Sequence, residues 1–410
     1  MKALQFSDSI PRYALSKAVS KARSDVFWGR LACLQMREVD PPPLPNGEWL
    51  RVRTRFGGIC GSDLGTITLH ASTSTSVFTS FPFTLGHENV GVAGDLGDQV
   101  AGVVPGQRVV VNPLLPCSTR GFDDPCDMCA RGDVQLCQRF NQGTIAPGLL
   151  TGFCRDTGGS WSKEFVAHQS QVLIVPDNVS DEQAVLAEPF AVAIHPVIRD
   201  VPGDDDTVVI IGGGVIGLCT IAAIRGLGSR ARIIVIARHE FQAQMARELG
   251  ADVVVGRLKD SALEKRMVDE LGANSLKPIL GKNVIVGGAQ YVYDCVGSPS
   301  SVDDALRYAG SGGSVVLIGL AGVPAGVDWT PIWLNELTVR GTFCYGIEEY
   351  QGERLPAMAV ALRLMAEGKV DLEPLLTHRF RLDDYQEALA TVTGKSSSGV
   401  IKAVFAFEDE

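Results

Sequence analysis

The sequence contains no run of about 18 apolar residues, so no segment is predicted to cross a membrane as a helix. Its first residues, MKALQFSDSI, lack a charged region followed by a sustained apolar stretch, so no secretory signal is expected. Lys and Arg number 37 against 47 Asp and Glu, and the net charge of −10 argues against a nucleic-acid partner, because that binding depends on basic side chains. Ten cysteines in 410 residues are too few for a disulfide scaffold, and we expect a cytoplasmic protein.

The spacing of the apolar residues changes along the chain and predicts two domains. Up to about residue 175, short alternating runs are separated by Gly and Pro, as in an antiparallel β-rich domain. Beyond residue 206, the apolar runs TVVIIGG, ARIIVIA, ADVVVG, AQYVYDCVG and GSVVLIGL alternate with helix-like segments. Strands that are apolar on both faces and alternate with helices indicate a parallel, doubly wound sheet. The predicted fold class is therefore α/β.

Three segments do not fit this simple pattern. Residues 8–35 include ALSKAVSKARSDVF, which has helical spacing and a basic polar face. Residues 180–198 begin with the capping-box pair Ser180 and Gln183 and predict one apolar helix, which Pro189 bends unless it lies near a turn. Residues 256–288 are long for one crossover, and we expect an additional element there.

A glycine-rich turn follows the first strand of the second block. In TVVIIGGGVIGLC, Gly212, Gly214 and Gly217 have G-x-G-x-x-G spacing, and Val215 and Ile216 open the following helix. The first glycine permits a tight turn, the second lets a pyrophosphate approach the backbone, and the third lets the helix pack on the strand. We therefore predict a dinucleotide-binding site here.

The second strand of this block ends without a carboxylate. Where an acidic residue would bind the adenine ribose hydroxyls, the sequence has Ala237, Arg238 and His239. A guanidinium can bind a 2′-phosphate through two parallel hydrogen bonds, and no carboxylate repels that phosphate. We therefore expect NADP rather than NAD; the alternative is that Arg238 is a solvated residue at a strand end.

Four side chains suited to a metal stand in short motifs. GGICGSDLG contains Cys60, LGHENVG contains His87 and Glu88, and LAEPFAVAIH contains Glu188 at the entry to the second block. A thiolate, an imidazole and a carboxylate suit Zn²⁺ with one position left open. Each residue alone also has a structural interpretation, such as Cys60 filling the core or His87 ending a strand.

Taken in order, GICGSD, GHE, AEPFAVAIH, the glycine motif, ELGAD and NELTVRGTF resemble the motifs of zinc-dependent medium-chain alcohol dehydrogenases. The resemblance is to the sorbitol and threonine dehydrogenase branch and covers the chain outside about residues 8–35. It implies a β-rich, GroES-like catalytic domain made of residues 1–187 and 342–410, and a Rossmann dinucleotide-binding domain made of residues 188–341. It also implies an NAD(P)-dependent oxidoreductase that contains zinc.

The same resemblance assigns metal ligands. Cys60, His87 and Glu88 would hold the catalytic zinc. Glu188 would be a further ligand, or would bind the water on the zinc and exchange with Glu88. The zinc would lower the pKa of an alcohol, which then gives hydride to the nicotinamide; the reverse reaction reduces a ketone or an aldehyde.

Further residues are assigned around these ligands. Asp63 would orient the metal-bound imidazole, and Ser62 would accept the alcohol proton and pass it on. The backbone near three residues would border the nicotinamide: Val296, Ile318 and Phe343.

Two features depart from the pattern of the family. Many relatives have a histidine five residues after the catalytic cysteine, at the outer end of a proton relay, and here that residue is Gly65. The proton would leave by another route, such as water, and His70 is a weaker candidate for that role. The polar run HASTSTSVFTSF at residues 70–81 would shape the substrate cleft or form a surface loop.

The stretch NPLLPCSTRGFDDPCDMCARGDVQLC contains four cysteines, and by resemblance residues 112–140 form a structural-zinc lobe. Relatives usually have C-x2-C-x2-C-x7-C, and Cys126, Cys129 and Cys137 keep the last two spacings. The first cysteine, Cys117, is separated from Cys126 by the inserted residues STRGFDDP. Four thiolates suit a tetrahedral zinc, with Asp123 or Asp124 as alternatives to Cys117, whereas a disulfide is not expected in a reducing compartment.

The resemblance leaves the substrate open, with polyols, sugar-derived alcohols and amino alcohols favoured. It implies a homodimer or homotetramer, with no membrane or nucleic-acid partner. The nearest rival is a zinc-independent quinone or enoyl reductase of the same superfamily, although such enzymes generally lack the Cys60, His87 and Glu88 set. A zinc-containing binding protein without catalysis is disfavoured by an acidic chain that has no basic stripe.

Overall fold

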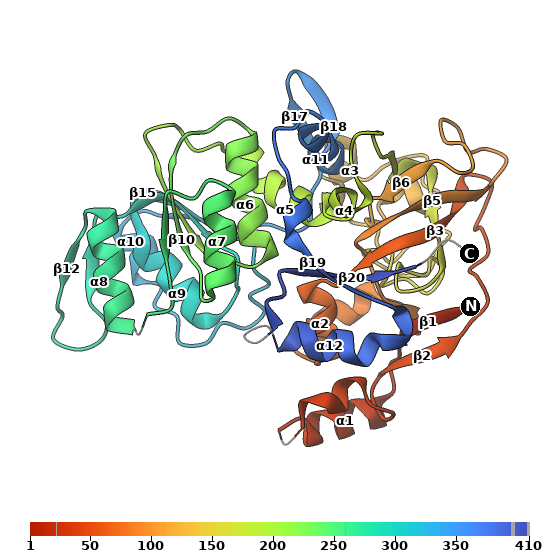
Figure 1. Cartoon of the computed structure of the whole chain (residues 1–410), viewed down its shortest axis with the longest axis horizontal. Helices are drawn as coiled ribbons and strands as arrows, with labels where there is room; N and C mark the ends of the chain where they lie inside the picture. The colour runs from red at the N-terminus through yellow and green to blue at the C-terminus, as the bar shows by residue number, and fades with distance from the viewer. Residues whose placement is uncertain (22, 259, 395–397, 408–410) are drawn as a thin grey trace. The chain divides into compact units, whose positions relative to one another are not determined.

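The computed structural model describes residues 1–21, 23–258, 260–394 and 398–407. The chain forms two compact units, and Figure 1 labels many of their elements. Unit 1 comprises Met1–Glu188, Met358–Ala366 and Asp371–Glu410, and unit 2 comprises Pro189–Ala357 and Glu367–Val370.

A seven-stranded sheet forms the centre of unit 1, with strand order β19–β20–β3–β5–β6–β8 and β7 paired to β3. The pairings are antiparallel except that of β19 with β20. The strands are β3 (Trp49–Gly58), β5 (Asn89–Leu96), β6 (Arg108–Val111), β7 (Glu164–His168), β8 (Val172–Ile174), β19 (Leu376–Phe380) and β20 (Lys402–Ala406). This architecture confirms the predicted β-rich first block.

A second, three-stranded sheet in unit 1 consists of β1 (Lys2–Phe6), β2 (Leu34–Glu38) and β4 (Phe83–Thr84). Trp161 lies between this sheet and the central one, fully buried, and its Nε1 donates to the carbonyl of Gly58 at 2.8 Å. The helices of unit 1 are α1 (Ile10–Val19), α2 (Gly61–Ile67), α3 (Asp127–Arg131), α4 (Asp181–Ala184), α11 (Ala357–Ala366) and α12 (Tyr385–Thr393). The short 3-10 turns are η1 (Ser24–Trp28), η2 (Thr73–Phe78), η3 (Cys117–Arg120), η4 (Val134–Leu136), η5 (Gln169–Gln171), η6 (Glu373–Leu375) and η7 (Leu382–Asp384).

Unit 2 contains a six-stranded parallel sheet with order β11–β10–β9–β14–β15–β16, which confirms the predicted doubly wound sheet. Its strands are β9 (Thr207–Ile211), β10 (Arg232–Ile236), β11 (Val253–Val255), β14 (Ala289–Asp294), β15 (Ala309–Leu317) and β16 (Thr338–Gly341). The chain runs outward from β9 to β11 and then returns to β14. The switch point of the sheet therefore lies at the carboxyl ends of β9 and β14, where such folds bind ligands.

Helices cover both faces of this sheet (Figure 1). One face carries α6 (Val215–Gly226) and α7 (Glu240–Glu248), and the other carries α8 (Asp260–Leu271), α9 (Pro299–Tyr308) and α10 (Thr330–Leu334). The additional element expected within residues 256–288 is an antiparallel ribbon of β12 (Asn274–Leu276) and β13 (Val284–Val286).

A second ribbon, β17 (Ile347–Tyr350) and β18 (Glu353–Pro356), follows the last strand of the parallel sheet. Glu348 of this ribbon is buried and accepts hydrogen bonds from His195 Nδ1 at 2.5 Å and from Arg199 Nε at 2.9 Å. These contacts tie the ribbon to α5 (Ala187–Ile198) and explain why residues 342–357 cluster with unit 2, although the sequence assigned them to the first domain.

The helix predicted for residues 180–198 is divided into α4 and α5, and the break between them lies close to Pro189, where a bend or a turn was expected. Ser180 caps α4 by accepting from the backbone N–H of Gln183 at 3.2 Å, but the Gln183 side chain donates to Asp371 and does not complete the capping box. Pro189 lies in the first turn of α5, where its missing N–H costs no helical hydrogen bond. No helix in the described ranges is long and apolar enough to cross a membrane.

Candidate active site

Three predicted ligands of unit 1 meet at one end of the central sheet. Cys60 follows β3 and precedes α2, while His87 and Glu88 stand between β4 and β5. One donor atom from each of the three lies within 4.8 Å of the other two. His87 and Glu88 are buried, and Cys60 is half-buried. Because their backbone segments are fixed by two sheets, this arrangement is set by the fold.

Polar neighbours fix the ring of His87. Its Nδ1 lies 3.2 Å from Oδ1 of the fully buried Asp63, and Oδ2 of Asp63 accepts from the backbone N–H of Cys60 at 3.0 Å. On the other side, Nε2 of His87 lies 3.4 Å from Oγ of Ser62. Burial acts to lower the pKa of His87, but the negative charges of Asp63 and Cys60 raise it well above its usual value. The local field therefore favours a positive charge at this point.

Lys402 is a member of this site that the sequence reasoning missed. It opens β20, has 1% of its surface exposed, and donates to the carbonyl of Ile59 at 3.1 Å and to Oε2 of Glu88. Burial acts to lower the pKa of Lys402, but Glu88, Cys60 and Glu188 raise it above its usual value. A lone lysine inside the apolar run VIKAVFAF was the signal that could have identified it.

The other predicted residues of the first block lie around this group. Glu188 is buried in the first turn of α5 but is not a member of the three-residue donor set found in the described chain. A Cβ placed on Gly65 would meet nothing within 4 Å, so the space where relatives carry a histidine is open. His70 is exposed and its Nδ1 pairs with Oγ1 of Thr68 at 2.9 Å.

The polar run at residues 70–81 forms η2 and contributes no buried residue within that turn. Phe153, which the sequence reasoning did not single out, lies beside the donor set, with its ring centroid 5.8 Å from that of His87. Its surroundings are aromatic, because Phe83 lies 5.2 Å from it by ring centroids. This side of the site is therefore apolar.

The residues present fit a zinc ion. Oε1 of Glu88 is buried and has no hydrogen-bond partner in the described part of the chain, which is costly unless a cation or proton lies against it. A thiolate, an imidazole and a carboxylate are suitable ligands, and the second-sphere Asp63 has the position of a residue that orients a metal-bound histidine.

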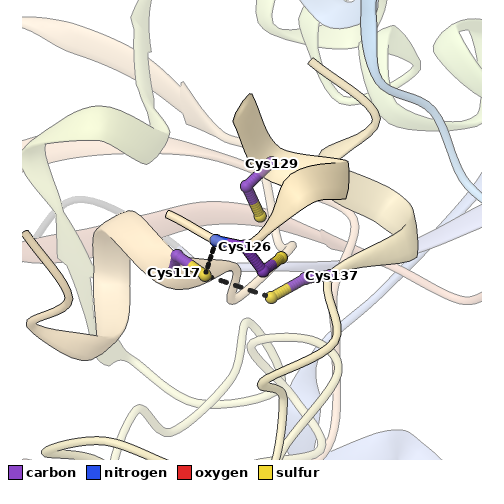
Figure 2. A group of neighbouring side chains, drawn as sticks. All are labelled: Cys117, Cys126, Cys129 and Cys137. Carbon is purple, nitrogen blue, oxygen red and sulfur yellow. Dashed lines mark hydrogen bonds between the residues drawn. The ribbon is translucent and has the colours of Figure 1, made fainter. Parts of the chain in front are cut away.

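A second group of possible ligands lies elsewhere in unit 1 and consists of Cys117, Cys126, Cys129 and Cys137 (Figure 2). Their four sulfur atoms lie within 4.8 Å of one another, and none of the ten cysteines forms a disulfide. Backbone N–H groups donate to the sulfurs: that of Cys126 to Cys117 at 3.4 Å, and that of residue 139 to Cys137 at 3.4 Å. Such donors stabilise thiolates, so the group suits a tetrahedral metal ion.

The inserted residues between Cys117 and Cys126 do not displace Cys117 from this group. Asp123 and Asp124, the alternative ligands, are exposed and lie outside it. The insertion instead contributes Arg120, which is fully buried and bonds to backbone carbonyl oxygens of residues 115 and 142–148.

The predicted nucleotide residues lie in unit 2, at the switch point of the sheet. Gly212 ends β9 with φ +109°, a conformation that favours glycine. A Cβ on Gly217 would overlap the carbonyl oxygen of Gly212, so α6 can pack against β9 only with glycine there. Gly214 caps α6, and a Cβ on it would meet nothing within 4 Å. Open space in front of Val215 and Ile216 at a helix N-terminus suits a pyrophosphate.

The end of β10 carries the residues that bear on cofactor choice. Ala237 is buried, and Arg238 is exposed and makes no hydrogen bond or ion pair with any described residue. His239 stacks on Phe241, with ring centroids 5.5 Å apart. An unpaired guanidinium in a chain of net charge −10 suits an anionic group.

Three further predicted residues follow the carboxyl ends of β14, β15 and β16, the same edge as the glycine turn. Val296 is half exposed, and its N–H donates to Oδ1 of the buried Asp294 at 3.0 Å. Ile318 is buried, and its N–H donates to the carbonyl of Asp294 at 2.9 Å. Phe343 is half-buried.

Known proteins match this chain along most of its length. A family model described as an alcohol dehydrogenase GroES-like domain matches residues 46–177, and one described as a zinc-binding dehydrogenase matches residues 215–359. L-idonate 5-dehydrogenase of Vitis vinifera is 29% identical and covers 87% of each chain, and sorbitol dehydrogenase of Arabidopsis thaliana is 28% identical over 94% of this chain and 96% of its own.

Other similar proteins extend these matches. L-threonine 3-dehydrogenase of Aeromonas hydrophila is 26% identical over 94% of this chain and 98% of its own. A solved structure from Sinorhizobium meliloti, described as a zinc-binding dehydrogenase bound to NADP, has a TM-score of 0.70 and 25% identity over 91% of this chain and 96% of that chain.

Proposed function

The chain belongs to the zinc-dependent medium-chain alcohol dehydrogenase family, in the branch of the sorbitol and threonine dehydrogenases, and from this premise we propose how its residues serve the reaction. It is a zinc-dependent oxidoreductase that transfers hydride between an alcohol or polyol and a nicotinamide cofactor. One observation supports the assignment of residues above all others: Cys60, His87 and Glu88 form a donor set in a chain whose second unit carries an open glycine turn.

Cys60, His87 and Glu88 hold the catalytic zinc. Glu188 is either a further ligand or the residue that binds the water on the zinc. Zinc bound there supplies a Lewis acid that lowers the pKa of an alcohol. Asp63 fixes the ring of His87, so the imidazole keeps one orientation throughout the reaction.

The proton of the alcohol passes to Ser62, whose Oγ is within 3.4 Å of His87. From Ser62 it passes to water in the open space beside Gly65, where no side chain continues the relay. Phe153 closes one side of the site with an apolar ring and helps to exclude bulk water from the reacting carbon.

The nicotinamide cofactor occupies the switch point of the parallel sheet. Gly214, Val215 and Ile216 at the start of α6 would hold its pyrophosphate, and Gly212 and Gly217 allow the turn. The nicotinamide ring borders the backbone near three residues: Val296, Ile318 and Phe343. The cofactor is the hydride acceptor in oxidation and the donor in reduction.

We further propose that the cofactor is NADP, because Arg238 and His239 stand where an acidic residue would select NAD. Replacing Arg238 with Ala tests this: the Michaelis constant for NADP is expected to rise about tenfold or more, the cost of a lost charge-assisted pair of about 1.5–3 kcal/mol, while that for NAD changes little. An unchanged constant for NADP would refute the preference. The matched control is Arg230→Ala, which removes an exposed arginine paired with Asp204.

A second zinc, bound by Cys117, Cys126, Cys129 and Cys137, is proposed to brace the lobe of residues 112–140. Metal analysis should give two zinc ions per chain in the native protein and one in a Cys117→Ser variant. Two ions retained in that variant would mean that another residue is the fourth ligand.

The substrate is proposed to be a secondary alcohol or polyol, as the names of the similar sorbitol and idonate dehydrogenases suggest. A screen of polyols and their ketones with both cofactors, on protein of measured zinc content, identifies it. Activity should vanish with complete removal of zinc and return when zinc is restored. Activity that survived zinc removal would support a zinc-independent reductase instead.

A cytoplasmic homodimer or homotetramer is proposed, with residues 1–187 and 342–410 as the catalytic domain and 188–341 as the cofactor domain. The edge strand β16 and the exposed Trp333 of α10 support association through the cofactor domain. Light scattering on the purified protein tests this, and a monomer would refute it.

A further inference from the structure

Lys402 is the only lysine that is buried among the described residues, and its position at the metal site needs an explanation. Burying an ammonium group costs several kcal/mol unless paired and hydrogen-bonded groups offset the loss of water. Its partners are the carbonyl oxygen of Ile59 and Oε2 of Glu88. Since β20 is held between β3 and β19, the backbone of Lys402 is fixed at the end of the sheet where Glu88 lies.

The two oxygens of Glu88 have different surroundings. Oε2 pairs with Lys402, whereas Oε1 is buried without a hydrogen-bond partner in the described chain, and Glu88 offers one carboxylate oxygen to the donor set with Cys60 and His87. Gly58 lies close to the same oxygen as Lys402, because a Cβ there would overlap Oε2 of Glu88 and lie 3.0 Å from Cδ. Gly58 and Lys402 therefore both contact Oε2, and Oε1 is left for a cation.

The charges of the site lead to the same conclusion. Cys60, Glu88 and Glu188 together carry three negative charges when ionised, and a divalent cation balances two of them. The ammonium of Lys402 balances the third. Lys402 thus neutralises the carboxylate excess without occupying a coordination position of the metal.

We propose that Lys402 is a positioning residue: it holds one oxygen of Glu88, presents the other alone to the catalytic metal, and so keeps a coordination position open for substrate. This inference rests on the proposed zinc site. Without Lys402, Glu88 binds the metal through both oxygens and fills the open position. A residue that only filled buried space would leave the metal's coordination unchanged.

The test compares Lys402→Met with the native protein after cobalt(II) replaces the catalytic zinc. Four-coordinate cobalt absorbs visible light more strongly than five-coordinate cobalt. The variant is expected to lose intensity in the visible bands and to release cobalt to a chelator about tenfold more slowly, at the lower end of the effects of second-sphere changes. Imidazole, a small ligand for an open position, should shift the native spectrum but require about tenfold more concentration in the variant.

Three matched variants separate the proposal from a merely structural role. Lys402→Arg keeps the cation and should keep the native spectrum, and the exposed Lys2→Met, which removes a surface ion pair with Asp383, should do the same. Gly58→Ala keeps Lys402 but displaces Oε2 of Glu88, and should reproduce the spectrum of Lys402→Met even if that variant fails to fold.

Native-like spectra and chelator rates in both Lys402→Met and Gly58→Ala would overturn the proposal, even if their thermal midpoints fell. The same experiment distinguishes this failure from failure of the zinc site. If cobalt shows no thiolate absorption that a Cys60→Ser change removes, then Cys60 is not a ligand and the proposed function is wrong at that point. If that absorption is present and the spectra of Lys402→Met and Gly58→Ala match the native spectrum, only the role of Lys402 is refuted.

Discussion

Replacing Arg120 with Met should destabilise unit 1 more than any surface substitution. Arg120 is fully buried and has no carboxylate partner among the described residues; it bonds instead to five backbone carbonyl oxygens. These belong to Leu115 at 2.9 Å, Gln142 at 2.9 Å, Ile145 at 3.2 Å, Ala146 at 3.3 Å and Gly148 at 2.6 Å. The side chain thus joins the cysteine lobe to the loop that follows it.

The magnitude follows from the carbonyls that would lose their donor. At about 1 kcal/mol for each buried acceptor left unsatisfied, the five give about 5 kcal/mol. The methionine fills most of the volume, and water can reach part of the loop, so we expect about 3 kcal/mol in the free energy of unfolding. For a domain of this size, that loss lowers the thermal midpoint by about 6–12 °C.

The assay is thermal unfolding followed by tryptophan fluorescence. Three buried tryptophans of unit 1 report its unfolding, Trp28, Trp49 and Trp161, whereas the tryptophans of unit 2 are already exposed. Arg155→Met is the matched control, because Arg155 is 58% exposed and its nearest acidic partner, Asp156, lies 3.5 Å away. The control should change the free energy of unfolding by less than about 0.5 kcal/mol.

A change below about 1 kcal/mol in Arg120→Met would refute the reasoning, because it would mean that the carbonyls regain their hydrogen bonds without the guanidinium. Zinc content measured on the same samples adds a second readout. Because Arg120 closes the turn that begins at Cys117, the variant should also release zinc from the lobe faster than the native protein.

Three other predictions concern the active site, the cofactor and the acid stability of unit 2. Gly65→His places an imidazole in open space, at the end of the proton relay where relatives carry a histidine. Turnover should rise at pH values where proton release limits the rate. A kcat profile against pH that matches the native one would show that water already carries the proton away. Gly217→Val would force α6 away from Gly212 and should weaken binding of the nicotinamide cofactor about 100-fold or more in a fluorescence titration. Gly322→Ala, whose Cβ meets nothing within 4 Å, should leave that binding unchanged. Burial acts to raise the pKa of Glu348, but hydrogen bonds from His195 and Arg199 lower it below its usual value. The ionised Glu348 therefore stabilises the fold above about pH 4.5, and this stabilisation is lost as the pH falls through the lowered pKa. Melting curves between pH 3 and 7 should therefore fall less steeply on the acid side for Glu348→Gln than for the native chain, and an equal acid slope in both would exclude Glu348 as the titrating group.

Much of the fold could be predicted because local patterns and the tertiary structure agree. Alternating runs formed the antiparallel sheet of unit 1, and runs apolar on both faces formed the parallel sheet of unit 2. At residues 180–198 a helix with a bend or a turn near Pro189 was predicted, but apolar periodicity alone could not show where the chain breaks between α4 and α5. There the Gln183 side chain bonds to Asp371, far away in sequence, and local signals do not contain such contacts.

The candidate site was predictable where its residues stand in short motifs. Cys60, His87, Glu88 and the four lobe cysteines were singled out from the sequence, and each group is brought together in space. Lys402 was missed because it stands 314 residues from Glu88 and has no motif of its own. Phe153 was missed because one aromatic residue in a loop gives no periodic signal.

The strand and helix periods and the spacing of the glycines could be read from the sequence alone, because each depends on residues that lie within a few positions of one another. The tertiary structure decided which distant groups share a charge environment. It brought the ammonium of Lys402 to one oxygen of Glu88, and the guanidinium of Arg120 to five carbonyl groups. Burial makes these contacts matter, since a charge removed from water must be balanced by whatever the fold places beside it.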